Sequence, residues 1–513
     1  MVPIGSGLYA PSRIERQTQR VWTEIASAFE YTKDADPRVE PNAGVPPLPD
    51  ENVLSALTAK ARDDLARIAH PRMPWLKPRI GPDGKPALDV LIVGGGQSGV
   101  AIASGLKRAM ADNILVVDRA PRGQAGPWLT YARMHTLRSP KDYTGPDLDL
   151  PSLGYQAWHE AGYGAASWQA LDLITRQDWA AYLDWVRETV GVPVRNEAEV
   201  VDIAPAAEGL LGATLRDGSV LFARKIVLAT GQDGAGVWWM PDFVAALPER
   251  FRAHAADPID FSSLRDRRVA VLGAGASAFD NAAMALEAGA SEAVLFCRRP
   301  EPQVVQPYRW LTFAGFLRHM SELDDPWRWR FMSRILGLRE GFPQETYDRC
   351  AIHAAFRLRS ASPWTAARVV GDAVVVETPL GPHTADFLIC GTGVEMDFSR
   401  RPELSRLAGN IAVWADRYDP PPEERDDRLA RFPYLAADFS LMPREAGVTD
   451  WMSDIHMFNI ASTMSFGPSG SSINAMTTAV PKLVAGLTRG LFKGDLERHW
   501  RSLQDYDVPQ AVL

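Results

Sequence analysis

Two glycine-rich turns constrain the fold of this 513-residue chain more than any other feature. The first is VLIVGGGQSGVA, residues 90–101, and the second is VAVLGAGASAFD, residues 269–280. Each follows a short β-branched run and opens an alanine-rich helical stretch, which is typical of the first turn of a βαβ unit. Such a turn directs backbone amides and a helix N-terminus toward a pyrophosphate. The sequence therefore predicts an α/β chain with two Rossmann-like dinucleotide-binding domains.

The residues at the end of the second strand of each unit indicate which nucleotide is bound. Asp118 stands there in the first unit, where a carboxylate can accept hydrogen bonds from ribose hydroxyls. Arg298 and Arg299 stand there in the second unit, and guanidinium groups pair well with the 2′-phosphate of an NADP. The alternatives are a nucleotide-free turn in the first unit and two solvated surface arginines in the second. FAD with NADPH is the simplest pair, because a chain that holds both can pass a hydride between them.

Composition and charge limit the partners. A net charge of -8 with a pI near 5.7 does not favour binding to nucleic acid or to an anionic membrane surface. The first residues lack the pattern of a secretory signal and no apolar run is long enough to span a bilayer, so we expect a cytoplasmic protein. Cys297, Cys350 and Cys390 form no CxxC pair, which argues against a disulfide framework and a dithiol redox centre. We expect no metal site.

The pattern of strands and helices predicts a nested organisation. Helices are expected within residues 12–31 and 53–69, on either side of a proline-rich loop. An aromatic-rich segment, residues 306–364, reads as a helical insertion. The expected parts are an N-terminal helical extension (1–86), an FAD-binding domain (87–245 and 386–513) and an NADP-binding domain between its halves (246–385).

Several further motifs resemble those of the two-dinucleotide-binding-domain flavoproteins. GPWLTY (126–131) is similar to the Gly-x-Trp segment near the flavin, and IVLATGQ (226–232) is similar to the strand end where the chain crosses between domains. DFLICGTGVEMDF (386–398) resembles the return crossing. Within these flavoproteins the chain resembles the class B flavin monooxygenases, which comprise flavin-containing, N-hydroxylating and Baeyer–Villiger enzymes. The resemblance covers roughly residues 88–491.

The turns and the resemblance together predict the cofactor contacts. A Gly/Ser-rich stretch before a helix that begins near Ile473 is similar to the last FAD-contacting helix of these flavoproteins, and an ordinary N-cap turn is the alternative. The residues expected at FAD are Gly94, Gly96, Gln97, Ser98, Gly99, Asp118, Arg119, Trp128, Ser469 and Ser471. Those expected at NADPH are Gly273, Gly275, Ala276, Ser277, Ala278, Arg298 and Arg299, with Thr230, Gly231, Thr392 and Gly393 at the two crossings.

The resemblance implies an FAD- and NADPH-dependent monooxygenase that inserts one atom of O2 into a small organic substrate through a C4a-(hydro)peroxyflavin. Nitrogen or sulfur is the expected acceptor, because the terminal oxygen of such a peroxide is electrophilic. The missing Trp-Pro ending of the Baeyer–Villiger fingerprint argues against ester-forming oxygenation of ketones. His254 stands at a position similar to the fingerprint histidine, with a structural histidine as the alternative. Arg138 and Ser139 fall where flavin-containing monooxygenases place an asparagine over the flavin. His254, Arg138 and Ser139 are therefore the catalytic candidates.

Three rival classes share parts of this pattern. A flavoprotein disulfide reductase needs a close dithiol, which the three scattered cysteines cannot form. An NADPH-dependent reductase or oxidase without oxygen insertion and a nucleotide-binding redox sensor are both compatible with the fold. The expected partners are a small-molecule substrate and O2, without nucleic acid or membrane, and a homodimer is one expected assembly.

Overall fold

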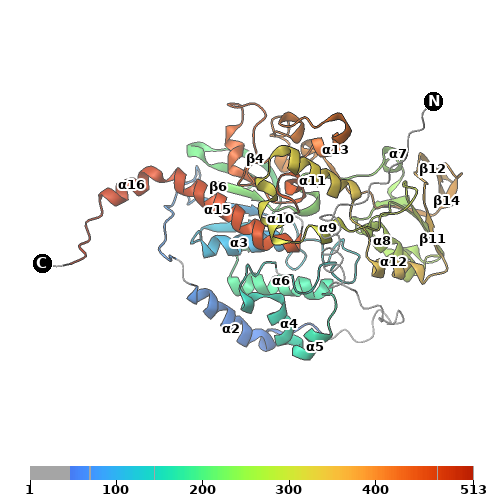
Figure 1. Cartoon of the computed structure of the whole chain (residues 1–513), viewed down its shortest axis with the longest axis horizontal. Coiled ribbons are helices and arrows are strands. Elements are labelled where there is room, and N and C mark those ends of the chain that lie inside the picture. Colours follow the sequence, from blue (N-terminus) through green and yellow to red (C-terminus); the bar gives the residue numbers. More distant parts are fainter. Residues whose placement is uncertain (1–46, 69–70, 144, 469, 471, 512–513) are drawn as a thin grey trace, which may run out of the picture. The chain divides into compact units, whose positions relative to one another are not determined.

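The computed structural model describes residues 47–68, 71–143, 145–468, 470 and 472–511 (Figure 1). Residues from Leu48 onward form one compact unit, which is described here by itself. The helix expected within residues 12–31 lies outside the described residues. The helix expected at 53–69 is present as α2, Glu51–Arg67, and Asp50 caps it by accepting a hydrogen bond from the Val53 amide.

A seven-stranded sheet forms the centre of the first dinucleotide domain (Figure 1). Its order is β3-β2-β1-β6-β5-β4, with β17 also paired to β6. The strands β3, β2, β1, β6 and β17 run parallel, whereas β5 and β4 extend the sheet antiparallel. Residues 90–93 of β1 and 226–228 of β6 are buried and apolar, as expected for parallel strands that are covered on both faces. The bounds are β1 Leu88–Val93, β2 Ile114–Val117, β3 Val194–Arg195, β4 Val200–Pro205, β5 Leu211–Leu215, β6 Val220–Leu228 and β17 Ile455–Met457.

Helices far apart in the sequence pack around this sheet. Helix α3, Gln97–Arg108, lies against α15, Met476–Gly494, and against α6, Arg176–Val190. Helix α2 packs on α4, Tyr155–Tyr163, and contributes the buried side chains Leu54 and Ala61 to the core of the first domain. The sequence predicts an N-terminal extension packed on a core, and in the structure α2 packs on the first domain through these two side chains.

The second dinucleotide domain is built on a five-stranded parallel sheet of order β11-β10-β9-β15-β8. Helices α8 and α12 pack together beside it, and a three-stranded antiparallel sheet, β12-β13-β14, adjoins it. The bounds are β8 Arg252–His254, β9 Arg268–Leu272, α8 Ala276–Glu287, β10 Glu292–Phe296, α12 Gln344–Ala351, β11 Phe356–Arg359, β12 Ala366–Val370, β13 Ala373–Glu377, β14 His383–Ala385 and β15 Phe387–Cys390.

Two short strands mark where the chain passes between the domains. Strand β7, Gly236–Trp238, follows β6 and pairs antiparallel with β16, Val394–Met396, which follows β15. Strand β15 belongs to the second sheet, so the boundary expected between residues 385 and 386 is misplaced and the return to the first domain begins after Cys390. The motif near this boundary contains both a strand and a crossing, and local sequence does not separate them.

The aromatic-rich segment 306–364 is helical, as its spacing predicts. It contains α9 Pro307–Trp310, α10 Ala314–His319 and α11 Asp325–Leu338 before α12 and β11. Its large side chains do not form a separate core. Phe316, Trp329 and Met332 pack with Trp414 and Phe432 of the returning first domain. The insertion therefore bridges the two dinucleotide domains.

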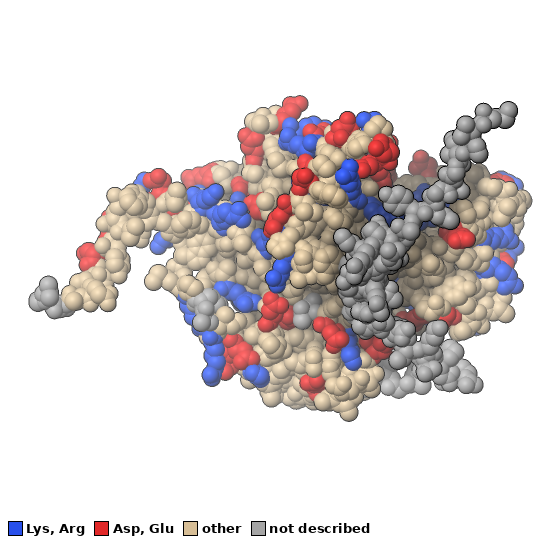
Figure 2. All heavy atoms as spheres, viewed as in Figure 1, with Lys and Arg blue, Asp and Glu red and all other residues tan. Residues whose placement is uncertain are grey.

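The remaining helices are short. They are α5 Ala165–Ala170, α7 Asp242–Ala245, α13 Asp427–Ala430, α14 Thr463–Phe466 and α16 Leu496–Gln504. Of the helices in the described ranges, none has the length and apolar character that crossing a membrane requires. Acidic and basic side chains are interspersed over the face that Figure 2 shows.

Candidate active site

The first glycine-rich turn is shaped for close approach of a ligand to the backbone. Gly94 has φ +111°, and a Cβ on Gly99 would lie 1.9 Å from the carbonyl oxygen of Gly94. No side chain fits at Gly99 without breaking the turn. Gly96 precedes α3 and offers no side-chain cap, so the first amides of α3 stay available for an anion.

Asp118 ties this turn to the end of β2. One carboxylate oxygen accepts from the Gly95 amide at 2.6 Å and the other accepts from the Ala120 amide at 2.7 Å. The side chain is buried, and each oxygen keeps a second lone pair for a ribose hydroxyl. Asp118 thus fixes the turn to the end of β2 and keeps acceptor capacity for a nucleotide.

A cleft opens beside the start of α3, and its lining includes Gly95, Gly96, Gly123, Ala125 and Trp128. The indole Nε1 of Trp128 is buried and has no hydrogen-bond partner within the described ranges. A wall of glycines, an uncapped helix start and an unpartnered donor together fit the diphosphate half of FAD.

The other residues expected at FAD lie close to the same turn or outside the description. Gln97 accepts from the indole of Trp179 at 3.3 Å, and Ser98 is buried in α3. Arg119 pairs with Asp233 at 3.3 Å, which joins the end of β2 to the first crossing. Ser469 and Ser471 lie outside the described residues. The helix expected to begin near Ile473 starts as a short 3-10 turn, Ile473–Ala475, that leads into α15.

The second glycine-rich turn repeats the geometry of the first. Gly273 has φ +121°, and a Cβ there would lie 2.4 Å from the carbonyl oxygen of Gly391 at the end of β15. Gly275 precedes α8 without a side-chain cap, and a Cβ on it would meet only open space. Ala276, Ser277 and Ala278 form the first turn of α8, as the sequence predicts for a pyrophosphate site.

Four guanidinium groups gather beyond the end of β10. Arg298 is exposed, whereas Arg299 donates to the carbonyl oxygens of Gly337 and Leu338 at the end of α11. Burial, together with the neighbouring charges of Arg428, Arg298 and Arg299, lowers the pKa of Arg339 to about 10. Such concentrated positive charge suits a phosphate. Sequence reasoning missed Arg339, because only the fold brings the end of α11 to β10.

Backbone and side-chain hydrogen bonds hold the residues of the two crossings in place. Thr392 donates to the Trp239 carbonyl, and the Trp239 amide donates to the Gly393 carbonyl at 2.9 Å. On the other crossing, Gly231 has φ +77° and Thr230 accepts a hydrogen bond from Asn459 at 3.0 Å. Asn459 is fully buried after β17 and was not predicted, although an asparagine at a strand end is a recognisable signal for such a bridge.

The segment expected to cover the flavin is tied to α8 and α12 of the second domain. Arg138 donates to Asp280 at 2.7 Å, and Arg349 reaches the same carboxylate at 3.3 Å. Thr136 donates to Glu345 at 2.9 Å. Ser139 makes no side-chain hydrogen bond among the described residues. Arg138 therefore acts as an interdomain contact in this state, and its ion pair positions the segment against the second domain.

Removing the charge of Asp280 is expected to destabilise the protein. The carboxylate is buried and also accepts from Thr346 at 3.2 Å, so Asp280→Asn removes the anion that half-buried Arg138 and buried Arg349 share, while Arg349 keeps its pair with Glu287. Breaking one side of a buried ion pair costs about 3–5 kcal/mol. Thermal unfolding checks this, with Asp419→Asn as the control, because Asp419 pairs with Arg425 at the surface. Equal midpoints for the two variants would contradict the assignment.

His254 lies at the end of β8 and packs on the indole of Trp238 with ring centroids 5.1 Å apart. Its Nδ1 accepts from the Ala256 amide at 3.1 Å. Burial lowers the pKa of His254 to about 4, so the ring is neutral at physiological pH. The geometry favours the structural alternative for this histidine, since its hydrogen bond serves the local turn.

The buried histidines predict a loss of stability in acid. Burial also lowers the pKa of His456 to about 4, while both rings take up a proton near pH 6.5 in the unfolded chain. The unfolded state therefore binds more protons below pH 6.5, and stability falls as the pH drops from 6.5 toward 4, by on the order of 3 kcal/mol per histidine. The melting temperature of His254→Gln with His456→Gln should fall less over this range than that of the wild type. A control at the exposed His319, His319→Gln, should melt like the wild type.

The cysteines do not form a redox pair. All three are free and buried, and burial raises the pKa of Cys350 and of Cys390 to about 12. A thiol that stays protonated is a poor nucleophile. The site therefore lacks the dithiol chemistry of a disulfide reductase, in agreement with the sequence.

Two nested dinucleotide domains, with an acid after β2 of the first and a basic group after β10 of the second, are typical of a two-dinucleotide-binding-domain flavoprotein. Comparison with known proteins gives the same class. Residues 91–233 match the family described as FAD-NAD(P)-binding, and residues 168–306 match L-lysine 6-monooxygenase/L-ornithine 5-monooxygenase. Among solved structures, the ornithine N-hydroxylase of Kutzneria sp. 744 superposes with a TM-score of 0.61 at 18% identity, over 79% of this chain and all of its own. The L-lysine 6-monooxygenase of Pseudomonas syringae gives 0.60 at 18% identity, over 78% and 99% of the two chains.

One relative is similar to this chain over nearly its whole length and identifies the family within this class. The FAD-dependent urate hydroxylase of Xanthomonas campestris pathovar campestris is 41% identical over 461 residues, which cover 90% of this chain and 97% of that protein. The chain belongs to the family of this hydroxylase, within the class B flavin monooxygenases. It is an FAD- and NADPH-dependent monooxygenase, and the predicted class, fold and cofactors are confirmed.

Proposed function

We propose that the protein hydroxylates urate or a closely similar oxidised purine. The observation that supports urate as the substrate is the 41% identity to a urate hydroxylase over nearly the whole of both chains. Bound FAD, once reduced by NADPH, supplies the activation of O2. The overall reaction balances as substrate, O2, NADPH and a proton giving hydroxylated substrate, NADP⁺ and water. One oxygen atom enters the substrate, and NADPH provides the two electrons that reduce the other to water.

Two arginines between the domains support an anionic substrate, and urate is an anion at neutral pH. Arg176 donates to the Trp128 carbonyl at 2.8 Å, and Arg133 donates to the Asp257 carbonyl at 3.0 Å. Neither has a carboxylate partner among the described residues, and both Nε atoms are buried without a hydrogen bond. Burial lowers the pKa of both groups, and the charge of Arg176 lowers that of Arg133 further. A bound anion would relieve this cost.

The other expected site residues take these roles within the proposal. Gly94, Gly96, Gly99, Asp118 and Trp128 hold FAD, and the turn from Gly273 to Ala278 with Arg298 and Arg339 holds NADPH. Arg138 is a positioning residue that keeps the segment beside Trp128 against the second domain. His254 keeps the crossing in place as a neutral ring.

N-hydroxylation of an amine is the second candidate, and the match of residues 168–306 to the lysine and ornithine monooxygenases favours it. An amino-acid substrate brings an ammonium group, which needs a free carboxylate. The buried carboxylate of Asp280 is already paired with Arg138 and Arg349, and Glu287 is paired with Arg349. These two carboxylates are therefore not free to bind an ammonium group, which favours an anionic purine over an amino acid as the substrate.

A cytoplasmic location belongs to this proposal, because the cell keeps NADPH there and the three cysteines are unpaired.

The test compares substrates with the FAD-loaded protein. NADPH oxidation is followed with urate, with ornithine and with lysine, and hydroxylated product is quantified for each. We expect urate to raise the rate and to yield product in proportion to the NADPH consumed. Coupled turnover with an amine but not with urate would replace the proposal by N-hydroxylation. NADPH oxidation that yields only hydrogen peroxide with all three would support the oxidase alternative.

A further inference from the structure

The last helix exposes an apolar face that nothing in the described chain covers. Helix α16 has no buried residue, and it extends beyond the end of α15 (Figure 1). Large apolar side chains recur along one side at helical spacing, at Leu496, Trp500 and Leu503, with exposed fractions of 53%, 56% and 65%. Tyr506 and Val508 continue this row into the tail. Solvent exposure of so much contiguous apolar surface is typical of an interaction site.

The base of α16 is firmly held, so its exposed face is presented in a defined direction. Asp495 precedes the helix, is almost fully buried, and pairs with Arg224 at 2.8 Å and with Arg79 at 3.1 Å. His499 stacks on Phe492 with ring centroids 4.9 Å apart. A helix this short is marginal in water unless its apolar face is packed. These anchors therefore support a helix whose remaining face needs a partner.

The charges along α16 and its tail are arranged to pair with a second copy of themselves. Arg498 and Arg501 lie on the helix, whereas Asp505 and Asp507 follow it. Arg501, Asp505 and Asp507 have no ion-pair partner in the part of the chain that the structure describes. In an antiparallel pair related by a two-fold axis, the basic half of each copy would face the acidic half of the other. Figure 2 shows the projecting segment, α16 and its tail, as mostly uncharged, with single basic and acidic groups along it.

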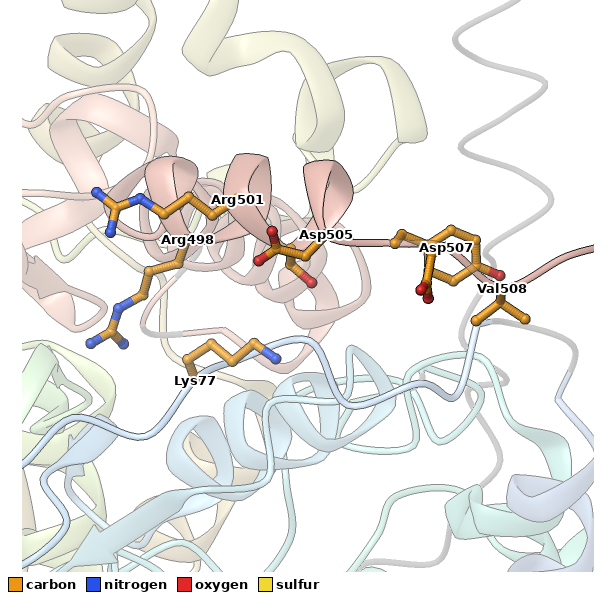
Figure 3. A pocket seen from close by; sticks show the side chains of 8 residues that line it. Lys77, Arg498, Arg501, Asp505, Asp507 and Val508 are labelled. Carbon is orange, nitrogen blue, oxygen red and sulfur yellow. The ribbon is translucent and has the colours of Figure 1, made fainter.

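A cleft lies next to this projecting helix on the same molecule (Figure 3). Lys77 forms one side and Arg498 and Arg501 of α16 form the other, while residues Asp505 to Val508 of the same chain's tail also line the cleft (Figure 3). Because α16 and its own tail form most of this cleft, a second copy that pairs antiparallel with the segment would lie against it. The acidic tail of one copy would then meet Lys77 and the two arginines of its partner.

We propose that α16 and residues 505–508 form the two-fold interface of a homodimer, by antiparallel pairing with the same segment of a second copy. Trp500 and Leu503 supply the apolar centre, and the arginine and aspartate pairs set the antiparallel register. The interface is small compared with a standard interface of about 800 Å² per partner, so the dimer should dissociate on dilution.

Sedimentation velocity of the FAD-loaded protein over a wide concentration range tests this directly. The wild type should shift from monomer to dimer as its concentration rises. Trp500→Asp with Leu503→Asp should raise the dissociation constant by about 100-fold or more, because two charged groups replace the buried centre. None of these residues lies at either dinucleotide turn, so FAD content and NADPH oxidation should equal those of the wild type and serve as the folding control.

Charge reversal gives the sharper test of the antiparallel register. An acidic variant, Arg498→Glu with Arg501→Glu, and a basic variant, Asp505→Lys with Asp507→Lys, should each be monomeric alone. Mixed in equal amounts, they should form a heterodimer, since every facing pair is then of opposite sign. A wild type that stays monomeric at all concentrations overturns the proposal, as does a mixture that fails to associate. Binding to anionic vesicles by a monomeric wild type, lost in Trp500→Asp, would assign the face to a membrane instead.

Discussion

Asp118→Ala is expected to yield a colourless protein that does not retain FAD. Both carboxylate oxygens accept backbone amides, from Gly95 and from Ala120, and in the proposed FAD site they also accept from the ribose hydroxyls. A hydrogen bond to a charged group contributes about 1.5–3 kcal/mol, so losing two ribose contacts lowers the affinity by roughly 100-fold or more. Absorbance of the purified protein and titration of the apoprotein with FAD measure this loss.

Asp118→Asn separates the charge of the side chain from its shape. An amide offers one acceptor oxygen where the structure uses two, so only one of the two backbone amides can be served. We expect an FAD affinity between those of the wild type and of Asp118→Ala. Asp112→Ala is the matched control, because Asp112 is an exposed acid before the opposite end of β2.

Binding of NADP⁺ distinguishes a specific loss of FAD from misfolding. The second turn lies in another domain with its own core, so Asp118→Ala should still bind NADP⁺. Retention of FAD at wild-type affinity in Asp118→Ala would show that the first turn is not the ribose site.

Arg298→Ala is expected to raise the KM for NADPH by about 10- to 100-fold and to leave that for NADH nearly unchanged. The reason is that only NADPH carries a 2′-phosphate, and one charge-assisted hydrogen bond accounts for this range. The double variant with Arg299→Ala should have a larger effect on NADPH. It should also unfold at a lower temperature, because Arg299 holds the last carbonyls of α11.

A neighbouring arginine provides the control for charge alone. Arg357 lies on β11 of the same sheet and donates only to nearby backbone carbonyls, so Arg357→Ala should keep the wild-type preference. Steady-state kinetics with both nucleotides gives the ratio of kcat/KM for each variant. An unchanged ratio in Arg298→Ala would remove the arginine group from the NADPH site.

The cofactor turns could be predicted from the sequence because their requirements are local. A glycine at position 99 is dictated by a carbonyl five residues earlier, and the acid at 118 follows from the next strand. The crossings could also be predicted, because a glycine follows the end of the strand at each of them. These features depend on backbone geometry over short stretches, which a single sequence records.

Contacts between distant segments could not be read in the same way. Asp280 is the last residue of the second glycine-rich stretch, 269–280. Its partners Arg138 and Arg349 come from a loop and a helix that only the fold brings together. Arg339 was missed for the same reason. The insertion was correctly predicted as helical, but its aromatic side chains pack on residues of the returning domain, which amphipathic spacing alone does not reveal.

We propose that one atom of O2 enters urate while one NADPH is oxidised to NADP⁺. Turnover of the FAD-loaded protein with urate under ¹⁸O2, followed by mass spectrometry of the product, tests it most directly. The account predicts one ¹⁸O atom in each hydroxylated purine and one NADPH consumed per product. A product that carries oxygen from water, or NADPH consumption with all labelled oxygen recovered as hydrogen peroxide, would contradict it.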